Sequence, residues 1–295
     1  MVESLAVPGS SEALSTIREL DVRFVVSTST LPGAGEAASP YVERTRLEGG
    51  VIYEVRWTPE ALAALDARED APPPPPGPVP FAPGERAIYD VFWEGGPLDV
   101  AAGTVTLTAR HTDEAGAQWQ FELYAETADW VSAFFTARDR FTTTTDAALL
   151  PLVHHREIRE GRRALDRSYK YDRTAGVVEA GGVTLPLASV HARDALSALY
   201  YVRTLPLDAP LAFPVSEAGR NQVVDVPAAV LEEIDRDGGR VPAWRLTPRL
   251  VRRIERRRPP AVIVWLAADE PRVPLRAVVD AGFGTIRLEL REYRP

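Results

Sequence analysis

Histidines and acids are the side chains in this sequence that could bind a metal or transfer protons, and their spacing favours neither chemistry. The four histidines are His111, His154, His155 and His191. His154 and His155 are adjacent in a strand-like pattern, so their rings point to opposite faces and one metal ion could hardly take both. The chain has no His-Glu-x-x-His motif and no cysteine, which excludes thiolate ligands and disulfides. The sequence predicts structural or surface histidines, and no metal site.

Serine nucleophiles and acid pairs are the next candidates for catalysis. No Gly-x-Ser-x-Gly elbow occurs. Ser197 shares a helix face with Asp194, three residues earlier, but a base is missing. We therefore expect Asp194 to cap or support this helix. Asp139 and Asp269 fit loop ends, where caps and ion pairs are common. A hydrolase or transferase that uses Asp139, Asp194 or Asp269 is the third functional hypothesis, and no catalytic residue is assigned.

Nucleotide and nucleic-acid binding find no support in the sequence. There is no phosphate-binding loop ending in Lys-Ser or Lys-Thr, and Gly282-Phe283-Gly284 precedes a strand pattern rather than a helix. The net charge of −8 argues against a protein that binds a phosphate backbone. No apolar run approaches the roughly 20 residues that span a bilayer. We expect no cofactor, no nucleic-acid partner and no transmembrane segment.

The most charged segment runs from Arg249 to Arg258 and holds six arginines against one acid. Because it lies between two strand patterns, it is predicted to form the tip of a long hairpin. A local positive patch in an acidic protein is typical of contact with phosphate head groups, anionic glycans or an acidic partner. The alternative is a solvated tip without a ligand. The residues assigned to anion or partner binding are Arg252, Arg253, Arg256, Arg257 and Arg258.

A proline-rich stretch divides the chain of 295 residues. Residues 71–80 favour an extended polyproline II spacer, because consecutive prolines fix φ and remove backbone donors. Residues 1–70 predict a small α+β segment, with strands at 41–47 and 51–57 around a Glu-Gly-Gly turn. A short helix is expected at 59–68, with Thr58 as its cap. Another short helix, capped by Ser10 or Ser11, is expected to end at residue 20.

Residues 81–295 predict a mainly β domain, a large curved antiparallel sheet or open half-barrel with one or two packed helices. Many short alternating patterns separated by Gly, Pro and Asp are typical of such sheets. A helix near 192–202 is expected to face the sheet with Leu196, Leu199 and Tyr200, and a second interruption lies at 130–136. The strands are expected at residues 87–93, 100–110, 118–127, 154–158, 164–172, 176–180, 182–187, 211–215, 221–227, 241–250, 261–267, 275–279 and 284–293.

The stretch from Phe81 to Trp93, a Pro-Gly-Glu turn and then a strand ending in an aromatic, resembles the opening of an uncharacterised bacterial family, domain of unknown function 3108. Other motifs that resemble the family follow in order at Gly103, 139–141, 194–203 and 264–274. The resemblance covers about residues 81–293 and leaves residues 1–70 outside. It implies a bacterial protein, usually exported to the periplasm or outer envelope, with no known activity. The strand layout is also similar to the half-barrels of lipoprotein carriers, a likeness of fold that says little about function.

Two further functional hypotheses follow from this. The first is a non-enzymatic envelope protein whose curved sheet binds an apolar ligand, such as a lipid, or a partner protein, with Trp130, Phe134 and Phe135 as the ligand-binding residues. The second is a structural or scaffold subunit that docks onto another chain through residues 1–70, because an exposed strand edge recruits partners. The first residues, Met1 to Ser4, lack the pattern of a signal peptide. Either a signal has been removed or the protein is cytoplasmic.

Overall fold

The computed structural model describes residues 24–27, 31, 34–37, 39–48, 50–56, 58–61, 72–94, 100–113, 116–132, 135–187, 189–236, 238–251, 261–280 and 284–295. The chain divides into two compact units, with a boundary between Pro72 and Pro73. The first unit contains a small sheet, and the second contains nearly all of the remaining strands and the longest described helix.

The first unit is a three-stranded antiparallel sheet in the order β1-β3-β2. Its strands are β1 (Phe24–Ser27), β2 (Tyr41–Leu47) and β3 (Gly50–Val55). The predicted hairpin is confirmed, because β2 and β3 pair around the Gly-containing turn. Thr58 also accepts a hydrogen bond from the Ala61 amide at 3.0 Å, as expected for a helix cap. The rest of the expected helix to residue 68, and the one at 11–20, lie outside the described residues.

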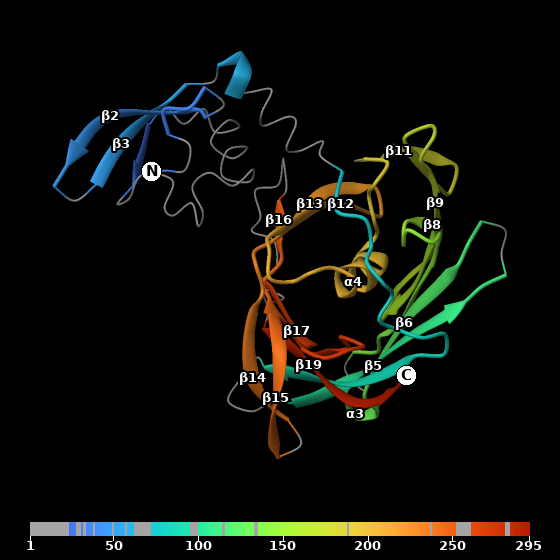
Figure 1. Cartoon of the computed structure of the whole chain (residues 1–295). Helices are drawn as coiled ribbons and strands as arrows, with labels where there is room; N and C mark the ends of the chain where they lie inside the picture. The colour runs from blue at the N-terminus through green and yellow to red at the C-terminus, as the bar shows by residue number, and fades with distance from the viewer. Residues whose placement is uncertain are drawn as a thin grey trace. The chain divides into compact units, whose positions relative to one another are not determined.

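The second unit is built on a 13-stranded antiparallel sheet in the order β11-β10-β9-β8-β7-β6-β5-β4-β19-β18-β17-β15-β14. The sheet is open, with β11 and β14 as its edges, so the mainly β prediction is confirmed. Figure 1 shows these strands curving around one helix. The strands are β4 (Arg86–Glu94), β5 (Val100–His111), β6 (Trp119–Thr127), β7 (Arg138–Thr145), β8 (Pro151–Glu160), β9 (Arg163–Asp172), β10 (Val177–Ala180), β11 (Val183–Pro186), β14 (Val230–Arg236), β15 (Gly239–Leu246), β17 (Val262–Ala267), β18 (Pro274–Asp280) and β19 (Thr285–Arg294).

A second, three-stranded sheet corrects one prediction. It contains β12 (Leu211–Glu217), β13 (Arg220–Val226) and β16 (Arg249–Val251), in that order. The strand expected at 241–250 is broken at Pro248, whose missing N–H interrupts a ladder. β16 then pairs with β13, whereas β17 pairs with β15 and β18. The arginine-rich segment therefore does not cap a hairpin of the two strands that flank it.

Two helices interrupt the strands of the second unit. α3 (Asp129–Ser132) is a single turn, and α4 (Ala195–Arg203) lies inside the curve of the sheet. As expected, Leu196 and Tyr200 are buried and Leu199 packs against the core from a half-buried position. Tyr201 is fully buried as well, which the sequence pattern does not predict. Within the described residues, no helix is long and apolar enough to cross a membrane.

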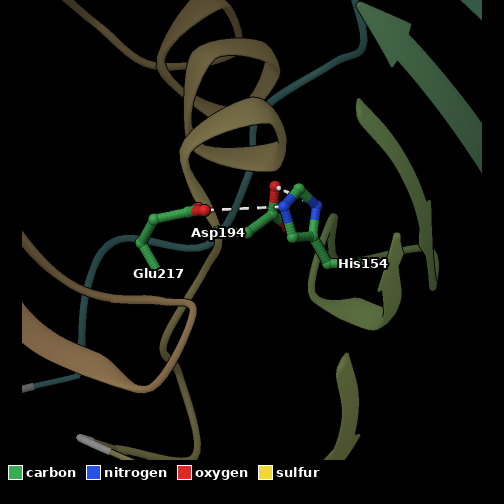
Figure 2. Close-up of side chains that lie close together, drawn as sticks. All are labelled: His154, Asp194 and Glu217. Atoms are coloured by element: carbon green, nitrogen blue, oxygen red, sulfur yellow. Dashed lines mark ion pairs between the residues drawn. The ribbon is translucent and has the colours of Figure 1, made fainter. Parts of the chain in front are cut away.

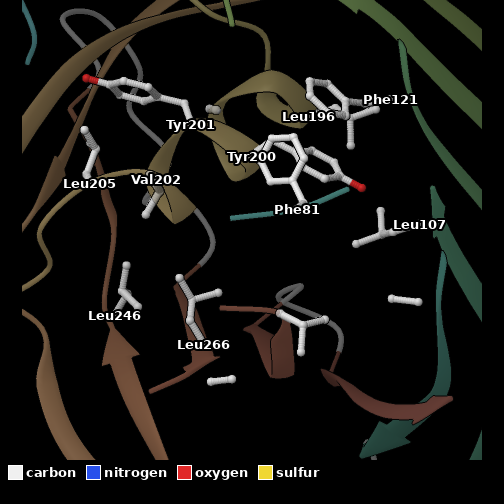
Figure 3. Close-up of a cluster of buried hydrophobic side chains, with 14 of the residues drawn as sticks. Phe81, Leu107, Phe121, Leu196, Tyr200, Tyr201, Val202, Leu205, Leu246 and Leu266 are labelled. Atoms are coloured by element: carbon white, nitrogen blue, oxygen red, sulfur yellow. The ribbon is translucent and has the colours of Figure 1, made fainter. Parts of the chain in front are cut away.

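Aromatic side chains fill the space between α4 and the sheet (Figure 3). The ring of Phe121 from β6 stacks on Tyr200 with centroids 3.8 Å apart. Phe81 packs edge-on against Tyr200 at 5.0 Å and against Trp119 at 4.9 Å. Such offset and edge-to-face pairs add stabilisation beyond the buried area itself. The part of the concave face that α4 covers is therefore a packed core.

Part of the proline-rich stretch packs against this helix. The Tyr201 hydroxyl donates to the Pro74 carbonyl. A Cβ at Gly77 would lie 2.5 Å from the Thr204 carbonyl oxygen, so only glycine allows this approach. Residues 74–77 thus run against the carboxyl end of α4 rather than as an isolated spacer.

Two buried tyrosines give a test of this core. The Tyr89 hydroxyl donates to the Pro274 carbonyl at 2.9 Å, whereas the Tyr200 hydroxyl has no hydrogen-bond partner among the described residues. We expect Tyr89→Phe to lower the free energy of unfolding by about 1–2 kcal/mol, and Tyr200→Phe to leave it unchanged or raise it, because an unpaired buried hydroxyl is unfavourable. Urea unfolding of both variants measures the difference. A loss in Tyr200→Phe as large as in Tyr89→Phe would contradict this packing.

Candidate functional site

The amino end of α4 is fixed by a fully buried carboxylate. Asp194 precedes the helix with extended backbone, and its Oδ1 accepts hydrogen bonds from the amides of Leu196 at 2.9 Å and Ser197 at 3.1 Å. The Ser197 hydroxyl donates to Asp194 Oδ2 at 2.7 Å. The expected capping role of Asp194 is confirmed, since these bonds satisfy amides that have no partner within the helix.

His154 from β8 contacts both this carboxylate and Glu217 at the end of β12 (Figure 2). Its Nδ1 is 3.5 Å from Asp194 Oδ1, and its Nε2 is 3.5 Å from Glu217 Oε1. Arg156 places Nη1 3.3 Å from the same Glu217 oxygen. Two carboxylates and two basic side chains thus meet where β8, β12 and the start of α4 come together.

The hydrogen bonds around Thr143 determine where the protons of His154 lie. The Thr143 hydroxyl donates its one hydrogen to Asp194 Oδ1 at 2.9 Å, so its contact with His154 Nδ1, also 2.9 Å, requires that Nδ1 carry a proton. His154 Nε2 then faces Glu217, and this contact is attractive only when Nε2 is protonated too. The geometry favours the imidazolium form of His154.

The pKa values of the pair agree with this charge distribution. Burial by itself lowers the pKa of His154, but its interaction with Glu217 and the charge of Asp194 outweigh burial and raise the pKa above its ordinary value. Burial likewise raises the pKa of Glu217, but His154, the Ala195 amide and Arg156 outweigh it and lower the pKa. Both shifts favour the charged form of the group, so the two side chains attract each other as an ion pair where both are charged.

His154, Asp194 and Glu217 offer ligand atoms within 4.8 Å of one another, close enough to hold a metal ion. The two carboxylates already have hydrogen-bond partners within the protein, however. Asp194 Oδ1 accepts two helix amides and Thr143, and Glu217 Oε2 accepts the Ala195 amide at 3.1 Å. Arg156 adds a positive charge beside Glu217. These residues fit an ion network that anchors α4 and do not fit a resident metal ion.

Trp93, Trp130 and Phe135 form a second feature of the unit, here called the aromatic rim. Trp130 in α3 donates from Nε1 to the Ala101 carbonyl of β5 at 3.1 Å. Ala101 pairs with the residue before Trp93 on β4. Phe135 follows α3, and its amide donates to the Val131 carbonyl at 2.8 Å. Trp130 and Phe135 leave 53% and 50% of their surface exposed, and Trp93 leaves 37%.

Comparison with known proteins identifies the second unit. The model of the family described as protein of unknown function (DUF3108) matches residues 88–291. The chain belongs to this family. This match confirms the resemblance stated from the sequence motifs. No curated protein matches the chain.

A solved structure supports the fold of this DUF3108 chain. The crystal structure of a beta-barrel-like protein of domain of unknown function DUF1849 from Brucella abortus matches with a TM-score of 0.51. The match is 13% identical and covers 71% of this chain and 96% of that chain. At this identity the likeness shows a shared fold and nothing of function.

The structure describes some of the predicted site residues and not others. Trp130 in α3 and Phe135 just after it are both exposed, and their role as ligand-binding residues stays a prediction. Phe134 lies outside the described residues. So do the arginines assigned to anion binding, Arg252, Arg253, Arg256, Arg257 and Arg258.

The three acids proposed for hydrolysis have separate structural partners. Asp139 accepts the Arg159 amide at 2.9 Å, Asp194 caps α4, and the Asp269 carbonyl accepts the Arg272 amide at 2.9 Å in a turn. No hydrogen bond or ion pair joins any two of these acids, all of which the structure describes. Their arrangement is that of caps and turns.

The sequence does not predict that His154 and Glu217 meet at Asp194. These residues are far apart in the chain, and only the three-dimensional path of β8 and β12 brings them to one helix end. The one available signal is the adjacent pair His154 and His155, whose opposite orientation is confirmed. His155 Nδ1 forms a hydrogen bond with the hydroxyl of exposed Ser168 at 2.8 Å, while His154 is buried.

The ion network predicts how stability depends on pH. Because the folded pKa of His154 is raised from 6.5, its stabilising contribution is complete below that value and is lost as pH rises through the folded pKa. Glu217, lowered from 4.5, contributes above that value and loses its contribution as pH falls through the folded pKa. The stability contributed by the pair is therefore greatest between about pH 4.5 and 6.5.

The variant His154→Gln tests the alkaline side of this profile, and His155→Gln is its matched control. Urea unfolding between pH 6 and 9 should show the wild type and His155→Gln losing stability as pH rises. His154→Gln should be less stable at pH 6 by about 3 kcal/mol, the order expected for breaking a buried pair. Its remaining stability should depend less on pH. Identical slopes in all three proteins would rule out His154 as the titrating group.

Proposed function

We propose that this protein is a non-enzymatic protein of the bacterial envelope that binds an apolar partner, the acyl region of a lipid surface, at its aromatic rim. The observation that supports this most is the exposure of Trp130 in α3 and of Phe135 just after it, in a unit whose other large aromatics are mostly packed. The envelope location is part of the proposal and comes from the family resemblance.

The chemistry of the rim suits a membrane interface. The Trp130 N–H is satisfied by the Ala101 carbonyl, so the ring can enter an apolar layer without carrying an unpaired donor with it. Tryptophan and phenylalanine are typical anchors at the boundary between head groups and acyl chains. Exposed Arg138 and Arg162 lie on the neighbouring strand and turn, where they are suited to lipid phosphates.

The rim is favoured over the inside of the sheet because α4 occupies the inside. Phe81, Phe121 and Tyr200 are buried there and stack on one another. A ligand between α4 and the sheet would have to displace this core. An apolar partner at the strand ends requires no such rearrangement.

Sedimentation with phosphatidylcholine vesicles, with and without phosphatidylglycerol, tests the proposal. We expect wild type to bind vesicles and the double variant Trp130→Ser/Phe135→Ser to bind at least about tenfold more weakly, since tenfold corresponds to only about 1.4 kcal/mol. Stronger binding to the vesicles with phosphatidylglycerol would support the role of the arginines.

Leu231→Ser is the matched control, because Leu231 is a similarly exposed apolar residue on edge strand β14. It should bind vesicles as wild type does. Absence of vesicle binding by wild type, or equal losses in Leu231→Ser and the rim variant, would contradict a lipid surface as the partner of the rim.

A scaffold role remains the second candidate because of one face of β1. Phe24 and Val26 lie on the same side of this edge strand and are 59% and 71% exposed. An exposed apolar edge is the feature that recruits another chain. If residues 1–70 dock onto a partner copy, light scattering should show an oligomer that Phe24→Ser/Val26→Ser converts to monomer. A monomer in both proteins would exclude self-association through β1.

A further inference from the structure

Two arginine side chains lie between the same two segments near the amino end of α4. Arg173, just after β9, donates from Nη2 to the Pro151 carbonyl at 2.8 Å and to the Ala192 carbonyl at 3.3 Å. Arg193, just before α4, donates to the Ala148 carbonyl at 3.2 Å and to the His191 carbonyl at 3.2 Å. Both guanidinium groups therefore connect the turn between β7 and β8 with the strand-like segment before α4.

The positive charges of this pair are not balanced by a carboxylate. Every hydrogen-bond acceptor of the two groups in the described chain is a neutral carbonyl, although Arg193 is only 2% exposed. The ring of Tyr201 lies under the Arg193 guanidinium at 3.5 Å and offers partial compensation. A buried charge without a counterion is unfavourable by several kcal/mol.

Asp146, an acid whose charge acts on both arginines, accepts hydrogen bonds from backbone amides instead. Its Oδ1 accepts the amides of Ala148 and Leu150, both at 2.9 Å, and so shapes the turn between β7 and β8. Within that turn Leu149 is fully buried and has a φ of 57°, a conformation that leucine rarely adopts. Asp146 acts on both arginines through its charge, without an ion pair to either.

Several donors of the pair remain unused. Nε and Nη1 of Arg173 and Nε of Arg193 are buried and have no hydrogen-bond partner among the described residues. The hydroxyls of Thr145 and Ser216 are also buried without a partner. Thr145 directly precedes the turn between β7 and β8, to which both arginines donate hydrogen bonds. The Ser216 amide donates to the Arg193 carbonyl at 2.8 Å. Buried polar groups in folded proteins are almost always satisfied, so this concentration of unused donors requires a partner.

We propose that Arg173 and Arg193 together bind an oxyanion, a phosphate or a carboxylate, at this end of the sheet. The planar guanidinium fork with its several N–H groups is the side chain best suited to such anions. Arg173 is only half-buried and is therefore the more accessible of the two, whereas Arg193 is buried. An anion there supplies the negative charge that the carbonyls cannot. The site lies at the opposite end of β7 from the aromatic rim and does not depend on the rim's function.

The pKa values of Arg173 and Arg193 agree with the lack of a carboxylate partner. Burial, with the charge of Arg173 adding to it, lowers the pKa of Arg193 to about 10, and burial lowers that of Arg173 as well. Arg203, which is equally buried, has its pKa raised because its interaction with Glu85 outweighs burial. The same residue type thus has opposite shifts with and without a carboxylate partner.

Titration of the full chain with inorganic phosphate at constant ionic strength, followed by thermal unfolding and calorimetry, tests the proposal. Chloride is the reference salt, and acetate is a second arm that distinguishes a carboxylate from a phosphate source. We expect saturable stabilisation by phosphate, acetate or both. Arg173→Gln should weaken it at least tenfold, and Arg173→Lys, which keeps the charge without the fork, should weaken it less.

Two control variants separate this site from other basic residues. Arg167→Gln removes an exposed arginine from β9, and Arg256→Ser/Arg257→Ser/Arg258→Ser removes charges from the arginine-rich segment. Both should bind the anion as wild type does. The proposal is overturned if neither anion stabilises the wild type more than chloride does, if Arg167→Gln loses as much as Arg173→Gln, or if only the triple change abolishes binding.

Discussion

The fold depends on keeping a helix with charged ends inside a curved sheet. Helix termini carry unsatisfied backbone groups, and α4 has little water around it to satisfy them. At its amino end Asp194 accepts the exposed amides, and at its carboxyl end Arg203 forms a two-pronged ion pair with Glu85, both contacts 2.7 Å. Tyr293 from the last strand donates to the same Glu85 carboxylate at 3.0 Å. The helix is therefore held by strands from the beginning, middle and end of the second unit.

This anchoring explains why the sheet remains open and yet well packed. Antiparallel sheets usually remove their edges by closing into a barrel, whereas this one curves around α4 and fills its concave face with Phe81, Phe121 and Tyr200. Both charge clusters specify where the helix sits, since an ion pair that is displaced inside a core becomes two unpaired charges. The aromatic rim and the paired arginines, for which partners are proposed, lie outside this core at the ends of the strands.

The sequence predicts most strands because their apolar residues alternate, and it fails where another residue type replaces that signal. The sequence does not predict β7, because the buried half of this strand is a run of threonines, among them Thr143 and Thr145. Threonine is polar, so it does not give the apolar alternation, but it is β-branched and suited to strands. β14 is not predicted either, because it is an acidic edge strand. The role of Asp194 is predictable because a cap is local, but its contact with His154 depends on the register of β7 and β8, which no local pattern encodes.

Charge balance distinguishes the paired arginines of the proposed anion site from the other arginines around α4. Arg203 is matched by Glu85, and Arg156 and His154 are matched by Glu217 and Asp194, so these clusters are complete within the protein. Arg173, which is half-buried, and Arg193, which is buried, differ because both donate to neutral carbonyls. A chain with a net charge of −8 has acids in excess, so it does not lack counterions in general. The absence of a carboxylate bonded to either arginine among the described residues is a local property. A site that keeps one buried and one half-buried cation without a fixed anion is suited to take one from solution.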